Sequence, residues 1–402
     1  MNDPTSLFPS DSLTGVRVVD FSLNLAGPYC GQILADLGAD VVKVERPGAG
    51  DPARDWAPPA WGGDGTLFLA ANRGKRSVAV DLGSSEGQEV RDRLLDGADV
   101  VIQAFRPDVA RRFGLTEEAL DPASSGRILC SITAFGEEGD DARPGYDPLL
   151  QAHAGLMSVT GPEEGPPVRV GTSMVDLGAG MWSALGVLAA LRSRDLTGQG
   201  SHVRTSLLDV ALGWGAYHIM GTLATGRPPR AMGTRLGMIS PYGSFPTSDG
   251  HLMIAAGNDE LFSRLCAALE LSRLLDDPRF ATNPDRVEHR EALETMLAEV
   301  TMRFTRGELE ETLRRAGVPC AAIRDMGEVA RDPEILQGTL RAEDHPRIAD
   351  YRAVALPVTW NRERAPARRP PPAVGEHTEE VLNELGYTAP EIEALKKGGA
   401  VA

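Results

Sequence analysis

The amino-acid sequence predicts an α/β fold, in which a parallel sheet with helices on both faces is followed by a smaller α+β domain. Short, continuous apolar runs alternate with helical patterns through the first third of the chain, which is typical of buried parallel strands joined by helices. After about residue 240 this alternation gives way to a hairpin and three helical segments. The length of 402 residues exceeds that of an ordinary single domain and fits such a division.

The first half of the chain supplies the elements of the larger domain. Strands are expected at residues 15–21, 40–45, 77–81, 99–104 and 128–133. Residues 28–37 are expected to form a helix that ends at Gly38, and residues 86–96 form a charged amphipathic pattern that predicts a second helix. Residues 181–191 are apolar on nearly every side, so they predict a buried helix.

The second half predicts the smaller domain and a return to the larger one. Residues 222–240 lack a period and are expected to be a linker, followed by hairpin strands at 241–250 and 251–256 and by helices at 260–269, 285–304 and 306–316. From about residue 329 the chain is irregular and proline-rich until a last helix at 378–385. We therefore expect a large domain formed by residues 1–221 and 329–402, with the linker and small domain at 222–328.

Charge and cysteine usage exclude several classes of function. The 57 acidic against 41 basic residues give a net charge of −16, which argues against nucleic acid or an anionic membrane as a partner. Cys30, Cys130, Cys266 and Cys320 lie far apart without CxxC spacing, so they predict reduced thiols and no metal site. The polar N-terminus lacks the pattern of a signal peptide, and the longest apolar run is too short to span a bilayer. We expect a soluble, cytoplasmic protein.

Asp176 stands just before the long apolar helix and is the strongest single candidate for chemistry. The N-terminus of a helix favours an ionised acid, and the small residues Gly178, Ala179 and Gly180 are expected to leave room beside it. An uncrowded, anionic carboxylate suits a nucleophile. The alternative is that Asp176 only caps the helix, and the local pattern leaves both interpretations open.

The ends of the predicted strands indicate a phosphate-containing ligand without a redox cofactor. The turn after the first strand has one glycine where dinucleotide-binding folds have GxGxxG, so no nicotinamide or flavin is expected. Basic or aromatic residues nevertheless recur at these ends, at Arg46, residues 72–76, Phe105 and residues 111–112. Such clustering would suit a polyphosphate that carries a flat base, although scattered surface arginines and a core phenylalanine would produce the same pattern.

Several motifs in order along the chain resemble the family III CoA-transferases, the CaiB/BaiF type. They lie at residues 13–21, 26–28, 38–48, 72–77, 145–147, 155–161, 175–176 and 241–243. The resemblance implies a Rossmann-like large domain with a smaller domain, in a homodimer whose two ring-shaped chains interlock. It also implies an enzyme that moves CoA from an acyl-CoA to a free carboxylic acid, with CoA as a substrate and without a permanent cofactor or metal.

The resemblance assigns the catalytic role to Asp176. Its carboxylate would attack the thioester to form a mixed anhydride, and the CoA thiolate would then form an aspartyl-CoA thioester that the acceptor acid displaces. Nearby N–H groups at the helix N-terminus are candidates to receive the oxyanion. Succinyl-CoA is a common donor in the family, and the sequence by itself names neither donor nor acceptor.

The CoA contacts of the family can be carried over position by position. The matching residues are Leu25, Ala26, Arg46, Ala71, Asn72, Arg73, Gly74, Ala104, Phe105, Arg106, Arg112 and Tyr146. Pro144 departs from the lysine of some formyl-CoA transferases, and the adjacent Arg143 is a candidate substitute.

Two other activities within this family, racemisation and oxalate-specific transfer, fit the sequence less well. The related α-methylacyl-CoA racemases use a histidine where this chain has Tyr146, whose phenol is a poor base, and His153 is expected to be a core or interface residue. Residues 233–241 replace the glycine run of the oxalate enzymes, and Arg235 there is a candidate for the acceptor carboxylate. A homologue that binds CoA without turnover is the remaining alternative.

Overall fold

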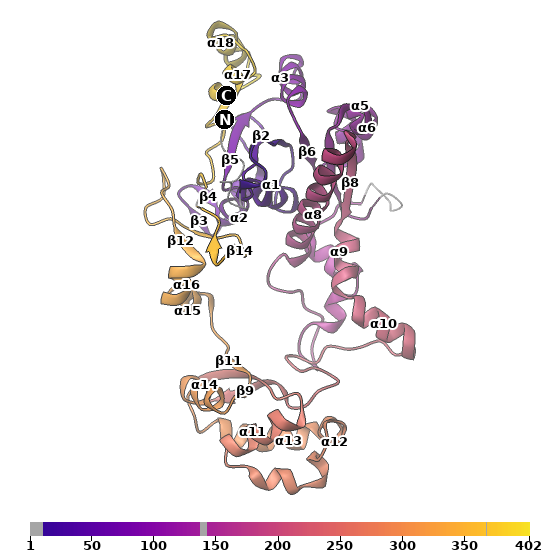
Figure 1. The fold of residues 1–402 in the computed structure, drawn as a ribbon, viewed down its shortest axis with the longest axis vertical. Helices are drawn as coiled ribbons and strands as arrows, with labels where there is room; N and C mark the ends of the chain where they lie inside the picture. Colours follow the sequence, from indigo (N-terminus) through magenta and orange to yellow (C-terminus); the bar gives the residue numbers. More distant parts are fainter. Residues whose placement is uncertain (1–10, 137–142, 367) are drawn as a thin grey trace. The chain divides into compact units, whose positions relative to one another are not determined.

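The computed structural model describes residues 11–136, 143–366 and 368–402, which form two compact units (Figure 1). Unit 1 contains the described residues of Met1–Ala154, Gly171–Ala216 and Pro333–Ala402. Unit 2 contains Gly155–Val170 and Tyr217–Asp332. The chain therefore enters unit 2 twice, first for a short segment and then for most of that unit, and it returns to unit 1 for its last seventy residues.

A six-stranded parallel sheet is the centre of unit 1, and it confirms the predicted α/β class. Its order is β5 (Lys75–Ala79), β2 (Asp40–Glu45), β1 (Arg17–Asp20), β6 (Val100–Gln103), β7 (Ile128–Thr133) and β8 (Ser201–Ser206). Five of these strands were predicted. The edge strand β8 was missed because its sequence, SHVRTS, contains a single large apolar residue.

The chain runs outward from β1 to β2 and β5, and then outward on the other side through β6, β7 and β8. Val18 accordingly pairs with Val41 on one side and with Val100 on the other. The strand order reverses between β1 and β6, and open α/β sheets bind ligands at the carboxyl ends of strands beside such a reversal.

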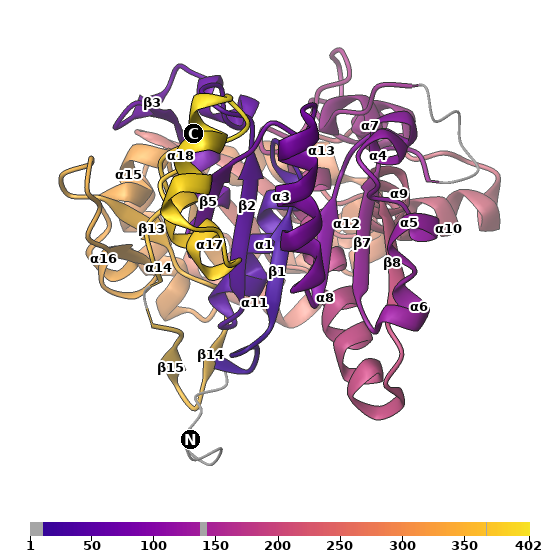
Figure 2. The same ribbon diagram turned by 90° about the horizontal axis from the view of Figure 1, so that it is seen from above.

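Helices cover both faces of this sheet (Figure 2). On one face α3 (Ser85–Asp96), α17 (Thr378–Glu384) and α18 (Ala389–Lys397) share an apolar core with strand residues such as Val19, Val42 and Val101. On the other face α1 (Ala26–Asp36) and α8 (Met174–Thr197) pack against each other and against the strands. The C-terminal segment is tied to β5, where the N–H of Ala79 donates to Thr378 Oγ1 at 3.1 Å.

Helix α8 is longer than the sequence suggested. The predicted apolar run of 181–191 was judged too short for a bilayer, but α8 has 24 residues and is the one helix in the described chain that is long and apolar enough to cross a membrane. The difference arises because the small residues before Met181 continue the helix. Half of its apolar stretch is buried within the structure, as in the core helix of a globular protein.

Unit 2 has a three-stranded antiparallel sheet covered by helices. The predicted hairpin is β9 (Tyr242–Thr247) with β10 (Gly250–Ala255), and β11 (Cys320–Ala322) adds an unpredicted third strand. Its helices are α11 (Asp259–Ala268), α12 (Asn283–Glu288), α13 (Arg290–Thr301) and α14 (Arg306–Arg315). The single helix expected at 285–304 is thus two helices separated at His289, and the start of the expected linker lies within α10 (Ala216–Thr225).

Shorter elements connect these layers. In unit 1 they are β3 (Ala60–Trp61), β4 (Asp64–Gly65), α2 (Thr66–Ala71), α4 (Pro107–Arg112), α5 (Glu117–Leu120), α6 (Pro122–Ser125), α7 (Asp147–His153) and α9 (Leu207–Trp214). The stretch expected to be irregular holds α15 (Met326–Ala330), α16 (Pro333–Gly338) and two hairpins, β12 (Leu340–Ala342) with β13 (Arg352–Val354) and β14 (Thr359–Trp360) with β15 (Glu363–Arg364).

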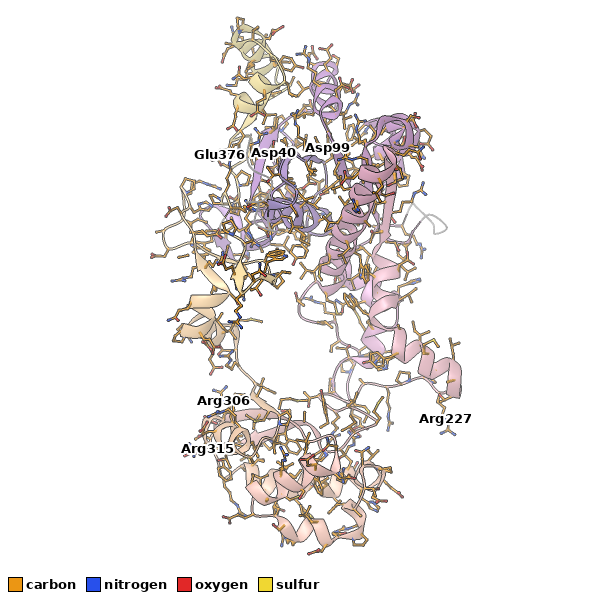
Figure 3. The ribbon with its side chains drawn as sticks, viewed as in Figure 1. Asp40, Asp99, Arg227, Arg306, Arg315 and Glu376 are labelled. Carbon is orange, nitrogen blue, oxygen red and sulfur yellow. The ribbon has the colours of Figure 1, made fainter. Side chains whose placement is uncertain are left out.

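Ion pairs between neighbouring elements line the surfaces of both units. Asp40 at the start of β2 pairs with Arg76 of β5, at 2.6 Å between Oδ2 and Nη2, and in unit 2 Arg306 pairs with Glu328 at 2.8 Å (Figure 3). In each pair at least one side chain is partly exposed to solvent, so we expect each pair to add little to the free energy of unfolding.

Candidate active site

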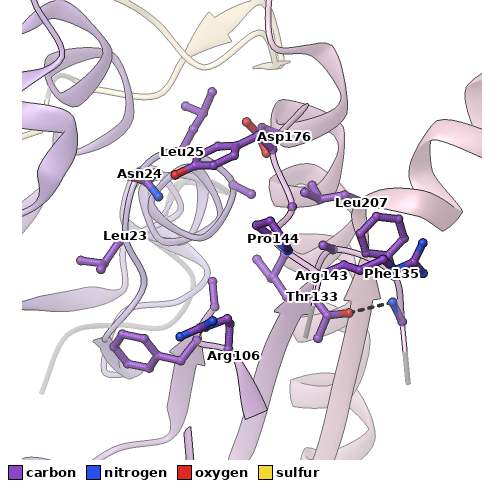
Figure 4. Close-up of a pocket in the computed structure, with 18 of the residues that line it drawn as sticks. Leu23, Asn24, Leu25, Arg106, Thr133, Phe135, Arg143, Pro144, Asp176 and Leu207 are labelled. Carbon is purple, nitrogen blue, oxygen red and sulfur yellow. Dashed lines mark hydrogen bonds between the residues drawn. The ribbon is translucent and has the colours of Figure 1, made fainter. Parts of the chain in front are cut away.

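A cavity of about 380 Å³ opens at the carboxyl ends of β1, β6 and β7 (Figure 4). Its walls are the segments that follow these strands, at residues 23–26, 104–107 and 132–136, together with residues 143–146, Asp176 and Leu207. It therefore lies at the reversal of strand order, where ligands bind in open α/β sheets. Asp176 is the one carboxylate that lines it among the described residues.

Asp176 stands in the first turn of α8, as the sequence predicted, but it does not cap that helix. The carboxylate that caps α8 belongs to Asp147, whose Oδ2 accepts the backbone N–H of Val175 at 2.7 Å and that of Asp176 at 3.2 Å. Gln151 Nε2 donates to Asp147 Oδ1 at 2.5 Å and holds the buried carboxylate in this orientation. The capping-only interpretation of Asp176 is therefore wrong.

The protonation of Asp176 also differs from the expectation. Burial, and to a smaller extent the nearby negative charge of Asp147, together raise its pKa from 3.8 to about 7. The helix N-terminus does not offset this, because its free N–H groups already serve Asp147. The same occupancy removes these N–H groups as donors to an oxyanion, which was their expected role.

The glycines after Asp176 serve close helix packing. A Cβ atom on Gly180 would stand 2.6 Å from the backbone oxygen of Ala26 in α1, and one on Gly178 would stand 2.8 Å from Val210 of α9. Because neither contact is possible, glycine at these positions allows α8 to approach both neighbours closely. The structure thus gives these glycines a packing role, and the expectation that they leave room for a ligand stays a prediction.

The structure brings seven of the proposed site residues together in this one cavity. They are Leu25, Ala26, Ala104, Phe105, Arg106, Tyr146 and Asp176. Arg46 after β2 and Arg112 at the end of α4 are solvent-exposed and do not line it. Their guanidinium groups can therefore reach only a ligand that extends out of the cavity.

Residues Ala71–Gly74 lie in the interior. Arg73 pairs with Asp36 at 2.6 Å between Nη2 and Oδ2, and the Asn72 side chain donates to the carbonyl of Phe68 at 2.9 Å. Ala71 and Asn72 are fully buried. Side chains held in this way anchor the segment between α2 and β5, and they leave it few free polar groups for a ligand.

A buried charge network, which the sequence analysis did not identify, supports the wall at residues 22–24. Lys43 Nζ pairs with Asp51 Oδ2 at 2.8 Å and donates to the Ser22 carbonyl at 2.9 Å, while Asp51 Oδ1 accepts the N–H of Asn24 at 3.0 Å. Burial alone would lower the pKa of Lys43, but Asp51, Asp20 and Glu45 raise it. The lysine therefore stays charged and holds the loop through its backbone.

A second buried lysine completes this network. Lys75 Nζ pairs with Asp20 at 2.9 Å and donates to the carbonyl of Pro28 at 2.7 Å, at the start of α1. Burial lowers its pKa to about 8. The motif at residues 72–77 was the only sequence signal for this role, and a lysine within a strand does not by itself reveal a buried partner.

The structure also shows the surroundings of Arg143, His153 and Arg235, whose roles the sequence left open. The guanidinium of Arg143 lies 3.7 Å from the ring centre of Phe135 at the cavity wall, and exposed His153 contacts the same ring edge-on without lining the cavity. Of the two expectations for His153, the core residue is therefore wrong, and the interface residue stays a prediction. In unit 2, Arg235 pairs with Glu163 at 2.9 Å and Glu294 at 2.8 Å, so two carboxylates already neutralise it.

The comparisons with known proteins agree with this geometry. A family model described as CoA-transferase family III matches residues 13–378. The succinate–glutarate CoA-transferase of Agrobacterium fabrum is 38% identical over 384 residues, covering 93% of this chain and 95% of that protein. The succinyl-CoA:glutarate CoA-transferase of Homo sapiens is 35% identical over 392 residues, covering 97% and 90%.

A solved structure is similar in both sequence and fold. The CaiB/BaiF family protein from Brucella suis is 36% identical, with a TM-score of 0.83 over 93% of this chain and 99% of that one. The family match, the full-length relatives and this fold agree with one another, and the chain is a member of the family III CoA-transferases.

Proposed function

We propose that this CoA-transferase works by covalent catalysis through Asp176. The observation that carries the proposal is that Asp176 alone presents a carboxylate to the cavity at the strand reversal, among the described residues. Burial strips water from this carboxylate, and a poorly hydrated anion is a stronger nucleophile. With a pKa of about 7, a substantial fraction is ionised at neutral pH.

The reaction would proceed through alternating anhydrides and thioesters. The Asp176 carboxylate attacks the thioester carbonyl of the donor, the C–S bond breaks, and CoA leaves as the thiolate. This thiolate attacks the aspartyl carbonyl of the mixed anhydride and releases the donor acid, which leaves an aspartyl-CoA thioester. The acceptor carboxylate then displaces CoA to form a second anhydride, and the returning thiolate attacks the acceptor carbonyl and frees Asp176.

CoA would lie across the carboxyl ends of the strands. Leu25, Ala26, Ala104, Phe105 and Tyr146 line the cavity and would contact the pantetheine and the adenine. Arg106 in the wall, with exposed Arg46 and Arg112 outside it, would meet the phosphates. The buried side chains of Ala71, Asn72 and Arg73 would limit that segment to contacts through its backbone.

The relatives suggest which substrates to test first. The relatives from Agrobacterium fabrum and Homo sapiens are named for succinate or succinyl-CoA and for glutarate, so we propose succinyl-CoA as donor and a dicarboxylic acid as acceptor. We also propose that the enzyme is cytoplasmic and requires no permanent cofactor or metal. Arg235 is no longer our candidate for the acceptor carboxylate, because Glu163 and Glu294 neutralise it.

An exposed apolar stripe supports a homodimer. Met181, Trp182 and Leu185 lie on one side of α8, and Trp182 and Leu185 each expose 54% of their surface. Exposed large apolar side chains at helical spacing are typical of an interface. In the interlocked arrangement dilution alone would not release folded monomers, and sedimentation at decreasing concentration would test this.

A mass-spectrometric CoA-exchange assay would test the proposed activity. Succinyl-CoA and other acyl-CoAs would be incubated with a panel of mono- and dicarboxylic acids, with wild type beside Asp176→Asn. We expect new acyl-CoA from wild type alone, and peptide mapping of quenched wild type should find CoA on the peptide that contains Asp176. Exchange of the α-hydrogen of a branched acyl-CoA without an acceptor acid would favour a racemase. Binding of CoA without either reaction would favour an inactive homologue.

A further inference from the structure

A second cavity in unit 1, of about 660 Å³, lies over the carboxyl ends of β6, β7 and β8. It shares Phe105, Pro107, Thr133 and Gly136 with the wall of the first cavity, and Asp176 does not line it. Three polar side chains of its wall form a chain of hydrogen bonds. Ser131 Oγ lies 2.8 Å from His202 Nε2, and His202 Nδ1 lies 3.1 Å from Glu117 Oε2. We propose that Ser131, His202 and Glu117 form a second catalytic site, which hydrolyses small acyl esters or thioesters through an acyl-serine.

A backbone N–H orients the Gln103 side chain, which donates to Ser131. Phe105 donates its N–H to Gln103 Oε1 at 2.8 Å, so the amide nitrogen of Gln103 must be the group that faces Ser131, at 2.8 Å. Gln103 then donates to Ser131 Oγ, and the serine hydroxyl has its proton free for His202.

The same logic fixes the histidine. The Glu117 carboxylate can only accept, so His202 Nδ1 donates to it, and in the neutral tautomer Nε2 is then the acceptor for the Ser131 hydroxyl. Arg204 pairs with the same carboxylate oxygen of Glu117 and restrains it. A serine whose proton is directed at a neutral histidine, which a carboxylate orients, is the ground state that nucleophilic serine catalysis requires.

The strands place these groups on one face of the sheet. In the parallel pairing of β7 with β8, Leu129 is opposite His202 and Ser131 is opposite Arg204, so the alternation of the pleat turns all of these residues to the same side. Ser131 is 6% exposed and forms part of the cavity wall beside His202 and Arg204.

The chemistry balances with water as the only co-reactant. Ser131 Oγ attacks the acyl carbonyl while its proton passes to His202 Nε2, and the bond to the leaving alcohol or thiol breaks as that group takes the proton back. Water then attacks the acyl-serine and releases the acid and Ser131. Gln103 Nε2, which lies beside Oγ, would donate to the oxyanion.

A serine-reactive fluorophosphonate probe tests this site directly in the full-length protein. We expect the probe on the peptide that contains Ser131, in wild type and in Asp176→Asn alike. His202→Gln should slow labelling by about a hundredfold or more, because the general base is lost. Ser206→Ala is the matched control, since Ser206 lines the same cavity but donates to Asp209, at 2.5 Å, and to no histidine.

Mapping the probe on wild type needs no variant, so a substitution that prevents folding does not decide the result. Hydrolysis of p-nitrophenyl acetate should fall with Ser131→Ala and His202→Gln and persist in Asp176→Asn. The proposal is overturned if Ser131 is not labelled, or if His202→Gln labels as fast as wild type. A higher KM of His202→Gln for acyl-CoA with unchanged labelling would overturn it in favour of a network that only holds Phe105.

Discussion

Asp147 and Asp176 face each other across the N-terminus of α8, where Asp147 Oδ2 accepts the N–H of Asp176 at 3.2 Å. Asp147 therefore occupies the helix N-terminus, which favours a negative charge, and Asp176 lines the cavity beside it. This division explains why the pKa of Asp176 is about 7 in a position that would ordinarily lower it.

We predict that kcat/KM falls as the pH drops below about 7, because the nucleophile is the ionised form of Asp176 and its pKa in the folded protein is about 7. Asp147→Asn should move this acid limb to lower pH, since it removes the negative charge that raises the pKa of Asp176. The amide oxygen can still accept from Val175, so α8 stays capped. The measurement is the pH profile of kcat/KM for both proteins, and a limb that stays in place would show that burial alone sets this pKa.

Asp176→Asn should abolish transfer and stabilise the fold at alkaline pH. Between its unfolded pKa near 3.8 and its folded pKa of about 7, Asp176 keeps a proton in the folded state that the unfolded state has lost. Wild-type stability therefore decreases as the pH rises through this window, and the asparagine protein does not titrate there.

Thermal unfolding of both proteins at pH 4 and pH 8 measures this effect. The melting temperatures should be close at pH 4, where Asp176 is largely protonated in the folded state, and Asp176→Asn should melt higher at pH 8. Asp209→Asn, on α9, is a control for the loss of a negative charge in the same unit. An equal difference at both pH values would contradict the titration of a buried Asp176.

The strands of the sheet could be predicted from the sequence more completely than the contacts of the site. Strands such as β2 and β7 were predicted because a parallel strand buried on both faces carries a run of branched apolar residues, such as Val41, Val42 and Val44 in β2. The edge strand β8 escaped because Ser201, His202 and Arg204 give no such signal. The site depends on pairs that are distant in sequence, such as Lys43 with Asp51 and Asp147 with Val175, and no periodicity reports these contacts.

We predict that Asp51→Ala strongly destabilises unit 1 and weakens acyl-CoA binding. It leaves Lys43 charged and buried next to fewer partners, a change that typically costs about 3–5 kcal/mol. It also frees the N–H of Asn24, so the wall of the cavity at Leu23 and Asn24 loses its support.

Denaturant unfolding and the KM for acyl-CoA check this prediction. The double variant Lys43→Met with Asp51→Leu should be more stable than Asp51→Ala, because it leaves no unpaired lysine in the interior. If the double variant were the less stable of the two, the ion pair would contribute more than its own desolvation costs, which is the opposite of our expectation.

Gly180→Ala should disturb the site through packing alone. The added Cβ would stand 2.6 Å from the Ala26 carbonyl oxygen and 3.1 Å from Tyr29 Cβ, so α1 and α8 must separate. Overpacking of this kind typically costs about 1–3 kcal/mol. Because Ala26 and Asp176 line the cavity from these two helices, we expect kcat/KM to fall with stability.

The matched control for this change is Gly213→Ala in α9, where a Cβ would meet nothing within 4 Å. Alanine there should be neutral or should stabilise the helix by up to about 1 kcal/mol, since glycine is the poorer helix former. The comparison therefore separates the loss of a close helix contact from the general effect of replacing glycine. Equal stability and activity of the two variants would show that α1 and α8 can relax apart without cost, and the close approach at Gly180 would then have no part in shaping the cavity.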